Sequence, residues 1–175
     1  MNAPAPQQKT SRTKRLGIAA AVAAAIAVPA EGLRQFAYWD PPGILTVCYG
    51  STTNVVQGKK YSLEECKARL DTDMMNAVTL VDTCQPGLPP NVLAAFSDAV
   101  YNMWPTIACN TQKSTAARML KAKDWAGACG QLPRWDKANM AGVMVSLPGL
   151  TKRREVERVL CLTPAAAEPV ASLTQ

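Results

Sequence analysis

A polar, basic start followed by an unbroken apolar stretch is the first pattern in the chain. Residues 1–15 are polar and basic, whereas residues 16–30 carry no charge and are mostly Ala, Val and Ile. This order is typical of a segment that directs export, with its basic end held in the cytoplasm. The apolar run is shorter than the roughly 20 residues that span a bilayer comfortably. We therefore expect residues 1–30 to form a basic tail plus a weak signal or anchor segment.

Three fates of this segment are compatible with the sequence. It is a signal peptide cleaved after Val28-Pro29-Ala30, a permanent anchor, or a segment that inserts and later leaves the membrane uncleaved. Its high alanine content disfavours a permanent anchor. Cleavage would make Glu31 the first residue, with no helix before it to hold its side chain, and this disfavours the cleaved peptide.

The residues after the apolar stretch predict a small β-region. Residues 31–39 are expected to leave a helix and become extended. Residues 40–43 form a turn, because two prolines fix φ and the closing glycine permits a positive φ. One strand is expected over 44–49 and a second, short strand over 55–56. No other β-region is predicted.

From Ser62 onward the apolar positions recur at helical spacing. Ser62 and Glu65 form a capping box, in which each side chain hydrogen-bonds the backbone N–H of the other at a helix start. Steps of three and four residues then separate the apolar positions Leu63, Cys66, Leu70, Met74, Val78 and Val81. This spacing predicts a long amphipathic helix that ends before Gln85.

Shorter helices are expected after the long one. Asn91 is expected to cap the next helix, and further helices are predicted over residues 112–121, 124–132 and 151–161, before a disordered tail over 163–175. The predicted fold class is α+β, mostly α. It has two lobes in residues 31–162: a small β-hairpin lobe, a long connecting helix and a larger helical C-terminal lobe. A cleft between the lobes is the expected place for an extended substrate.

Composition and charge are those of an ordinary globular domain. Hydrophobic residues make up 48% of the 175 residues, which suits one domain or two small lobes that share a core. The net charge is +6, but four positive charges lie within residues 9–15, so the rest is only mildly basic. Nucleic acid is therefore not an expected partner.

Six cysteines and the lack of histidine limit the metal chemistry. The cysteines are widely spaced, without a C-x-x-C pair, and this pattern does not fit a zinc site. An even number of cysteines in an exported chain favours disulfides, with buried free thiols as the alternative. The spacing alone does not give the pairing. No metal or cofactor is expected.

Glu31 and Asp40 are the candidates for chemistry. One lies at an expected helix end and the other in a hairpin turn, so the two could face each other across a cleft. Glycoside hydrolysis needs such a pair: one group protonates the leaving oxygen, and the other activates water or stabilises the cationic sugar. Apolar neighbours that favour a protonated acid are present at Leu33, Phe36 and Trp39. A surface glutamate and a turn aspartate are the alternative interpretation of this spacing.

One motif contains both carboxylates: Glu31-Gly-Leu-Arg, then Tyr-x-Asp40, then Thr46-x-x-x-Gly50. It resembles the catalytic signature of the phage lysozyme family, the endolysins related to T4 lysozyme. The family triad, Glu-x8-Asp-x5-Thr, falls on Glu31, Asp40 and Thr46 without a gap. Further similarity is found in residues 58–66, 94–102, 120–129, 134–135 and 148–158. The resemblance therefore covers about residues 31–162.

The resemblance implies a role for each of these residues. Glu31 would be the general acid, and Asp40 would position and activate water, helped by the Thr46 hydroxyl, with inversion at the anomeric carbon. Arg154 lies where the family has an arginine that pairs with the catalytic glutamate. The implied protein is an endolysin that hydrolyses the β-1,4 bond between N-acetylmuramic acid and N-acetylglucosamine in peptidoglycan and causes host cell lysis.

The resemblance also implies a disulfide pattern and a topology. Cysteines like these pair locally in secreted relatives, which gives Cys48–Cys66, Cys84–Cys109 and Cys129–Cys161. With every thiol paired, control is expected from the apolar segment, as in signal-arrest-release endolysins. Residues 16–30 would hold the enzyme at the host inner membrane, and release into the periplasm would restore the helix that carries Glu31. A holin would act indirectly, and the enzyme is expected to be a monomer.

Three departures from the family pattern concern the substrate groove. Gly50-Ser51 replaces Gly-His, Asn102-Met-Trp-Pro105 replaces Asn-x-Gly, and Pro133 interrupts a helix. Because acid–base catalysis by two carboxylates does not need the histidine, activity is still expected.

Two alternative functions are a catalytically inactive wall-binding protein of the same fold and a lytic transglycosylase, which releases an anhydro-sugar. The complete triad argues against the inactive protein.

Overall fold

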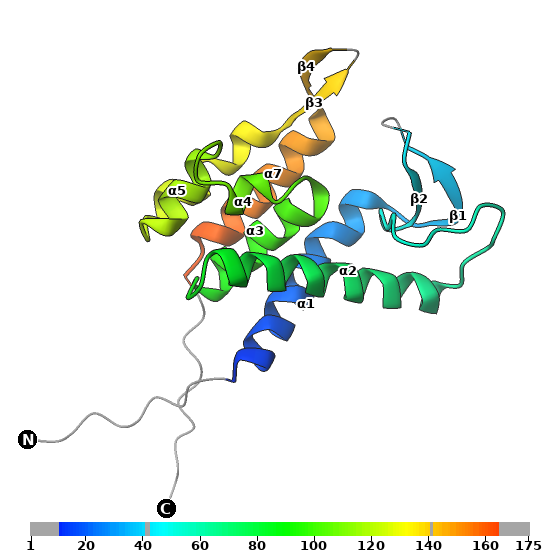
Figure 1. The fold of residues 1–175 in the computed structure, drawn as a ribbon, viewed down its shortest axis with the longest axis horizontal. Helices are drawn as coiled ribbons and strands as arrows, with labels where there is room; N and C mark the ends of the chain where they lie inside the picture. The colour runs from blue at the N-terminus through cyan, green and yellow to red at the C-terminus, as the bar shows by residue number, and fades with distance from the viewer. Residues whose placement is uncertain (1–10, 41–42, 141, 165–175) are drawn as a thin grey trace, which may run out of the picture.

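A computed structural model of the chain describes residues 11–40, 43–140 and 142–164. Most of the predicted basic tail and of the predicted disordered tail lies outside these residues. The described chain is mostly helical with two antiparallel strand pairs (Figure 1), which confirms the predicted fold class. The helices are α1 (Arg12–Glu31), α2 (Leu63–Cys84), α3 (Pro90–Asn102), α4 (Thr106–Cys109), α5 (Thr115–Lys121), α6 (Trp125–Cys129), the 3₁₀ turn η1 (Leu132–Trp135) and α7 (Pro148–Leu162). The strands are β1 (Arg34–Trp39), β2 (Leu45–Cys48), β3 (Lys137–Met140) and β4 (Val143–Ser146).

Helix α1 contains the whole apolar segment and packs against α2, α3 and α7. The Ser11 side chain caps it by accepting from the Lys14 N–H, and Gly32, at φ +69°, ends it. Its buried face consists of Leu16, Ala19, Ala20, Ala23, Ile26 and Ala27. Among the described helices, α1 is also the one that is long and apolar enough to cross a membrane by length and composition. In this structure the segment is therefore a core helix.

The small lobe is built on the antiparallel pair β1–β2, with Tyr38 opposite Thr46. The extended segment predicted before the turn is the first strand, and the strand predicted over 44–49 is the second. The short strand predicted at Val55-Val56 is wrong, because these residues lie in a loop. Side chains hold that loop: the Val56 N–H donates to the Tyr61 hydroxyl at 2.9 Å, and Arg69 donates to the Thr53 carbonyl at 2.7 Å.

Helix α2 joins the two lobes (Figure 1). The predicted capping box is confirmed, with the Glu65 N–H donating to Ser62 Oγ at 3.0 Å and the Ser62 N–H to Glu65 Oε2 at 2.7 Å. At its far end α2 reaches the helical lobe, where α3 lies between α1, α2 and α7. The predicted cap of α3 is wrong. Pro90 occupies the first turn, where its missing N–H costs nothing, and the Asn91 amide donates instead to the Thr163 carbonyl.

The helical lobe carries a second hairpin, β3–β4, which corrects the prediction of a single β-region. Its apolar residues Met140, Val143, Met144 and Val145 are all exposed, so no buried face gives the sequence a strand-like alternation. Figure 1 shows this hairpin projecting from the helical lobe. Helix α7 begins at Pro148, earlier than predicted, because proline suits a first helical position.

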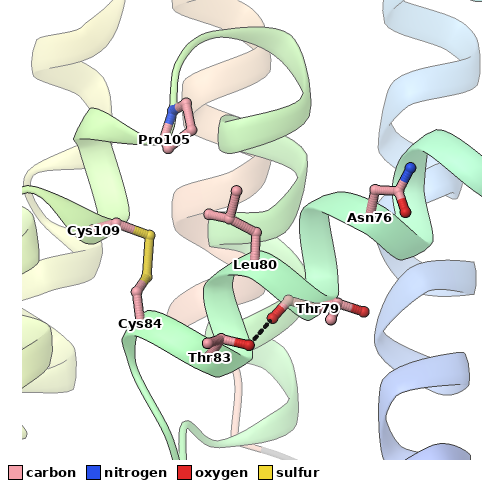
Figure 2. Close-up of a pocket in the computed structure, with 7 residues that line it drawn as sticks. All are labelled: Asn76, Thr79, Leu80, Thr83, Cys84, Pro105 and Cys109. Atoms are coloured by element: carbon pink, nitrogen blue, oxygen red, sulfur yellow. Dashed lines mark hydrogen bonds between the residues drawn. A yellow bond between two sulfur atoms is a disulfide. The ribbon is translucent and has the colours of Figure 1, made fainter.

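The structure pairs all six cysteines in the pattern that the family resemblance implied. One bond ties β2 to α2, one ties α2 to α4, and one ties α6 to α7. Figure 2 shows the second of these, Cys84–Cys109, beside a shallow and mostly apolar pocket that also contains Leu80 and Pro105. The bonds therefore attach β2 and α4 to α2, and α6 to α7. Both α2 and α7 pack against α1, the helix that ends at Glu31.

Candidate active site

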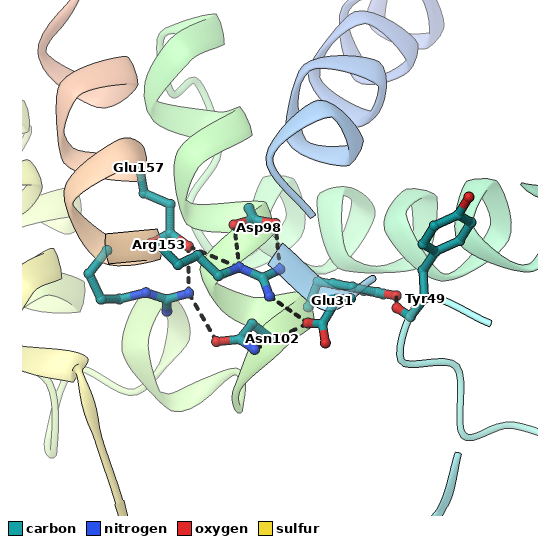
Figure 3. Close-up of polar contacts among 8 residues, drawn as sticks. Glu31, Tyr49, Asp98, Asn102, Arg153 and Glu157 are labelled. Carbon is teal, nitrogen blue, oxygen red and sulfur yellow. Dashed lines mark hydrogen bonds and ion pairs between the residues drawn. The ribbon is translucent and has the colours of Figure 1, made fainter. Parts of the chain in front are cut away.

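Glu31 is the last residue of α1, at the point where the chain leaves the helical core for β1. Its side chain is 23% exposed, so the carboxyl group is open to solvent on one side. On the other side its Oε1 accepts from Arg153 Nη1 at 2.5 Å and from Asn102 Nδ2 at 3.3 Å (Figure 3). A core helix, α3 and α7 thus fix the position of one half-exposed carboxyl group.

Arg153 is almost fully buried and donates two hydrogen bonds to Asp98. Its Nε donates to Asp98 Oδ2 at 2.9 Å and its Nη2 to Asp98 Oδ1 at 2.8 Å. Burial acts to lower the pKa of Arg153, but hydrogen bonding and attraction from Asp98, and then from Glu31, raise it overall. The guanidinium therefore stays charged and bridges two carboxylates from different helices.

Arg154 does not contact Glu31, which corrects the pairing that the family resemblance implied. The arginine that pairs with the glutamate is its neighbour Arg153. Consecutive helical residues point about 100° apart, so only one of the two can face the end of α1. Arg154 is fully buried, and its Nη2 donates to Asn102 Oδ1 at 3.0 Å and pairs with Glu157 at 2.5 Å.

Arg154 nevertheless affects Glu31 indirectly, by orienting the Asn102 amide that donates to it. A guanidinium has no acceptor atom, so it requires the amide oxygen of Asn102 and leaves the amide nitrogen for Glu31. The structure has this arrangement, with Oδ1 facing Arg154 and Nδ2 facing Glu31. Arg154 thus sets the orientation of a hydrogen-bond donor to the carboxyl group.

The Glu31 carboxyl group occupies the space next to Gly50 that a side chain at this position would need. A Cβ atom at this position would lie 3.3 Å from both Cδ and Oε2 of Glu31, and the backbone has φ +90°. The neighbouring Tyr49 carbonyl accepts from the Tyr101 hydroxyl. Burial, followed by the charge of Glu31, raises the pKa of Tyr101, which keeps this hydroxyl a donor. The turn after β2 therefore lies close to Glu31, and a side chain at Gly50 would press on its carboxyl group.

Asp40 and Thr46 lie together in the β1–β2 hairpin. Asp40 Oδ1 accepts from the Ile44 N–H at 2.6 Å, and its Oδ2 lies 3.4 Å from the Thr46 hydroxyl, which also donates to the Ile44 carbonyl at 3.1 Å. Thr46 is buried, so the turn holds its hydroxyl in place. The hairpin thus presents one oriented carboxylate.

Tyr38 connects this carboxylate electrostatically with Glu31. Burial raises the pKa of Tyr38, Arg34 opposes the rise, and Glu31 and Asp40 both add to it. Both carboxylates are therefore close enough to the same ring to influence its ionisation. The three residues of the predicted triad stand on two elements, with Glu31 at the end of a core helix and Asp40 and Thr46 in the hairpin.

The sequence interpretation missed Asp98 and Arg153. Asp98 stands in a run of buried residues of α3, and a charge at such a position requires a partner. That requirement was a signal in the sequence, although it does not name the partner. Within the described residues no cluster of three or more His, Cys, Asp or Glu side chains could hold a metal ion.

The chain is similar to several known proteins. The family model Phage lysozyme matches residues 28–157. The chain is 38% identical to the SAR-endolysin of Bacteriophage PS119 over 75% of this chain and 76% of the relative, and 34% identical to that of Enterobacteria phage P21 over 75% and 77%. The muramidase domain of SpmX from Asticaccaulis excentricus superposes with a TM-score of 0.70 at 25% identity, covering 90% of this chain and 100% of that domain. The chain belongs to the phage lysozyme family and is a lysozyme-type glycosidase.

Proposed function

We propose that this enzyme hydrolyses the β-1,4 bond between N-acetylmuramic acid and N-acetylglucosamine in peptidoglycan, with Glu31 as the general acid. The observation that carries the proposal is the position of Glu31: its carboxyl group is held by Arg153 and Asn102 and still 23% exposed. A general acid needs this combination, because its proton must reach the leaving oxygen along a fixed direction.

In the same proposal, Asp40 positions and activates the attacking water. Its Oδ1 is occupied by the Ile44 N–H, and its Oδ2 faces the Thr46 hydroxyl. Thr46 is close enough to both the carboxylate and the Ile44 carbonyl to help hold a water molecule beside the hairpin. Water that attacks from the hairpin side, opposite a leaving group protonated by Glu31, would invert the anomeric carbon.

The mass of the released muropeptides tests this chemistry. Hydrolysis adds water to each cleaved bond, whereas a lytic transglycosylase releases an anhydro-sugar. We expect hydrated products from wild-type enzyme on purified sacculi, and a large loss of rate from Asp40→Asn. Anhydro products would assign the reaction to the transglycosylase class, and undiminished clearing by Asp40→Asn would remove Asp40 from the mechanism.

We also propose that α1 controls the enzyme as in signal-arrest-release endolysins. While residues 16–30 lie in the host inner membrane, Glu31 is at the lipid boundary and the face of α1 that contacts α3 is occupied by lipid. Release into the periplasm lets α1 pack on α2, α3 and α7. Two observations support this: α1 is long and apolar enough to cross a membrane, and five of its six buried residues belong to the main hydrophobic core. A holin would act only through the membrane, and the enzyme would work as a monomer.

The exposed face of α1 offers a test that spares the folded enzyme. Ala21 and Ala25 are exposed in the folded chain, so Ala21→Leu and Ala25→Leu strengthen the membrane segment without filling the core. We expect the double variant to stay in the membrane fraction and to lyse late or not at all. The same variant refolded without membranes should clear sacculi at the wild-type rate, and lysis on the wild-type schedule would contradict the proposal.

A further inference from the structure

Glu31 stands at the edge of a network of charged and polar groups. Arg153 joins Glu31 to Asp98, and Asn102 joins Glu31 to Arg154. Glu157 completes the network, at 2.5 Å from Arg154 and 3.8 Å from Arg153. Figure 3 shows Glu31, Asp98, Asn102, Arg153 and Glu157 of this network, which come from α1, α3 and α7. Two arginines and three carboxylates therefore share one site, and only Glu31 among the carboxylates is open to solvent.

This arrangement contains a chemical conflict. A guanidinium 2.5 Å from Glu31 favours the ionised carboxylate. A general acid must hold its proton until it meets the leaving oxygen. An arginine with no other counter-ion would therefore orient Glu31 and at the same time remove the proton that the reaction needs.

Asp98 is placed to resolve this conflict. Its side chain is 0% exposed, and it takes two of the hydrogen bonds of Arg153, at 2.8 and 2.9 Å, while Glu31 takes one. Bidentate arginine–carboxylate pairs are the strong form of this interaction. Asp98 also raises the pKa of Arg153 more than Glu31 does. The charge of Arg153 is thus balanced mainly from the buried side.

The other groups near Glu31 do not provide this balance. Asn102 is neutral, and Tyr101 of α3 and Tyr38 of β1 both have a pKa raised by burial, so neither is a source of charge. Burial, followed by hydrogen bonding with Asp98, raises the pKa of Glu157 well above its ordinary value, although Arg154 and Arg153 oppose the rise. Glu157 lies nearer to Arg154 than to Arg153.

We propose that Asp98 is a positioning residue that neutralises Arg153, so that Arg153 can orient Glu31 without removing its proton. The inference rests on the proposed role of Glu31 as general acid. It adds that the useful pH range of the acid is set by a buried residue that touches neither substrate nor Glu31.

The test is the pH profile of sacculus clearing by purified full-length Asp98→Asn. An uncompensated Arg153 favours ionised Glu31, so the alkaline limb of the profile should move to lower pH by about one unit or more. Asp98→Glu, which keeps the charge, should bring the limb back toward the wild-type position. An unchanged alkaline limb in folded Asp98→Asn would overturn the proposal.

Asp82 supplies a matched control for loss of a buried carboxylate. It is also buried and paired with two arginines, Arg12 and Arg15, but at the opposite end of α1. Asp82→Asn should lower the melting temperature and leave the alkaline limb in place. A limb that moves equally in both variants would mean that general loosening, rather than the charge of Asp98, is responsible.

A second pair of variants covers the case in which Asp98→Asn does not fold. Arg153→Gln removes the positive charge beside Glu31 and keeps Asp98, so the alkaline limb of this variant should move to higher pH. Adding Asp98→Asn removes both charges and should return the limb toward wild type. Identical limbs in the single and double variants would overturn the proposal. Glu31→Gln separates the two levels: if it stays active, the proposed function fails, and if it is inactive while the limbs do not move, only the role of Asp98 fails.

Discussion

Both ends of α1 carry a cluster of arginines and buried carboxylates, but the two clusters differ in composition and exposure. At its start, Arg12 and Arg15 both pair with the buried Asp82, and the side chain of Arg12 is 65% exposed. At its end, the buried Arg153 pairs with the buried Asp98 and also with the half-exposed Glu31. The first cluster has two arginines for one carboxylate, so it only fastens the helix. The second shares one arginine between two carboxylates, which leaves one of them oriented and still partly open to solvent.

The largest effect on stability is expected from Arg153→Ala. The change leaves Asp98 buried without its partner, and such a loss costs about 3–5 kcal/mol in the free energy of unfolding. It also releases Glu31, so clearing of sacculi should fall more than stability alone explains. Denaturant unfolding and activity per folded molecule check the two parts separately. A variant that keeps wild-type stability would show that the second cluster is no tighter than the first.

A smaller effect on stability, but a specific one on activity, is expected from Gly50→Ala. The added Cβ meets the Glu31 carboxyl group at 3.3 Å and also strains a backbone at φ +90°. Strain of this kind costs roughly 1–3 kcal/mol, and displacement of a catalytic group lowers the rate by about tenfold to a hundredfold. Activity per folded molecule is the measurement.

Gly58→Ala is the control for backbone strain. Gly58 has φ +79°, and an added Cβ would meet nothing within 4 Å. It should lose a similar amount of stability and keep its activity. Equal activity losses at both glycines would mean that contact with Glu31 is not what matters at Gly50.

The smallest effect is expected at the start of α1. Asp82→Asn removes the two arginine contacts, and because Arg12 is largely exposed the loss should be about 1–2 kcal/mol in the free energy of unfolding. Sacculus clearing per folded molecule should not change. A fall in activity comparable with that of Gly50→Ala would mean that the two ends of α1 are coupled, and that the contrast between them does not hold.

Much of this fold could be predicted from local patterns. The capping box at Ser62 and Glu65 and the apolar spacing of α2 are signals that a few neighbouring residues carry by themselves. The hairpin β3–β4 has no such signal, because its apolar residues are exposed on both faces. The predicted cap at Asn91 failed for a local reason as well, since α3 already begins at Pro90 and Asn91 lies inside its first turn.

The site divides in the same way. The spacing of Glu31, Asp40 and Thr46 could be recognised in the sequence, because the three positions lie close together along the chain. Asp98 and Arg153 could not, because their contacts with Glu31 and with each other join α1, α3 and α7. The choice between Arg153 and Arg154 depends on the rotation of α7 about its axis, which only the packed structure defines. Burial of one face of α1 likewise needs its partner helices.

The most direct test of the account is the clearing of purified sacculi by Glu31→Gln. The glutamine amide has the size of the glutamate side chain and its oxygen can still accept from Asn102, but it has no acidic proton to donate. We expect the variant to have a wild-type far-ultraviolet circular dichroism spectrum and to clear sacculi about a hundredfold to ten-thousandfold more slowly. Clearing at the wild-type rate by the folded variant would contradict the assignment of Glu31 as the proton donor.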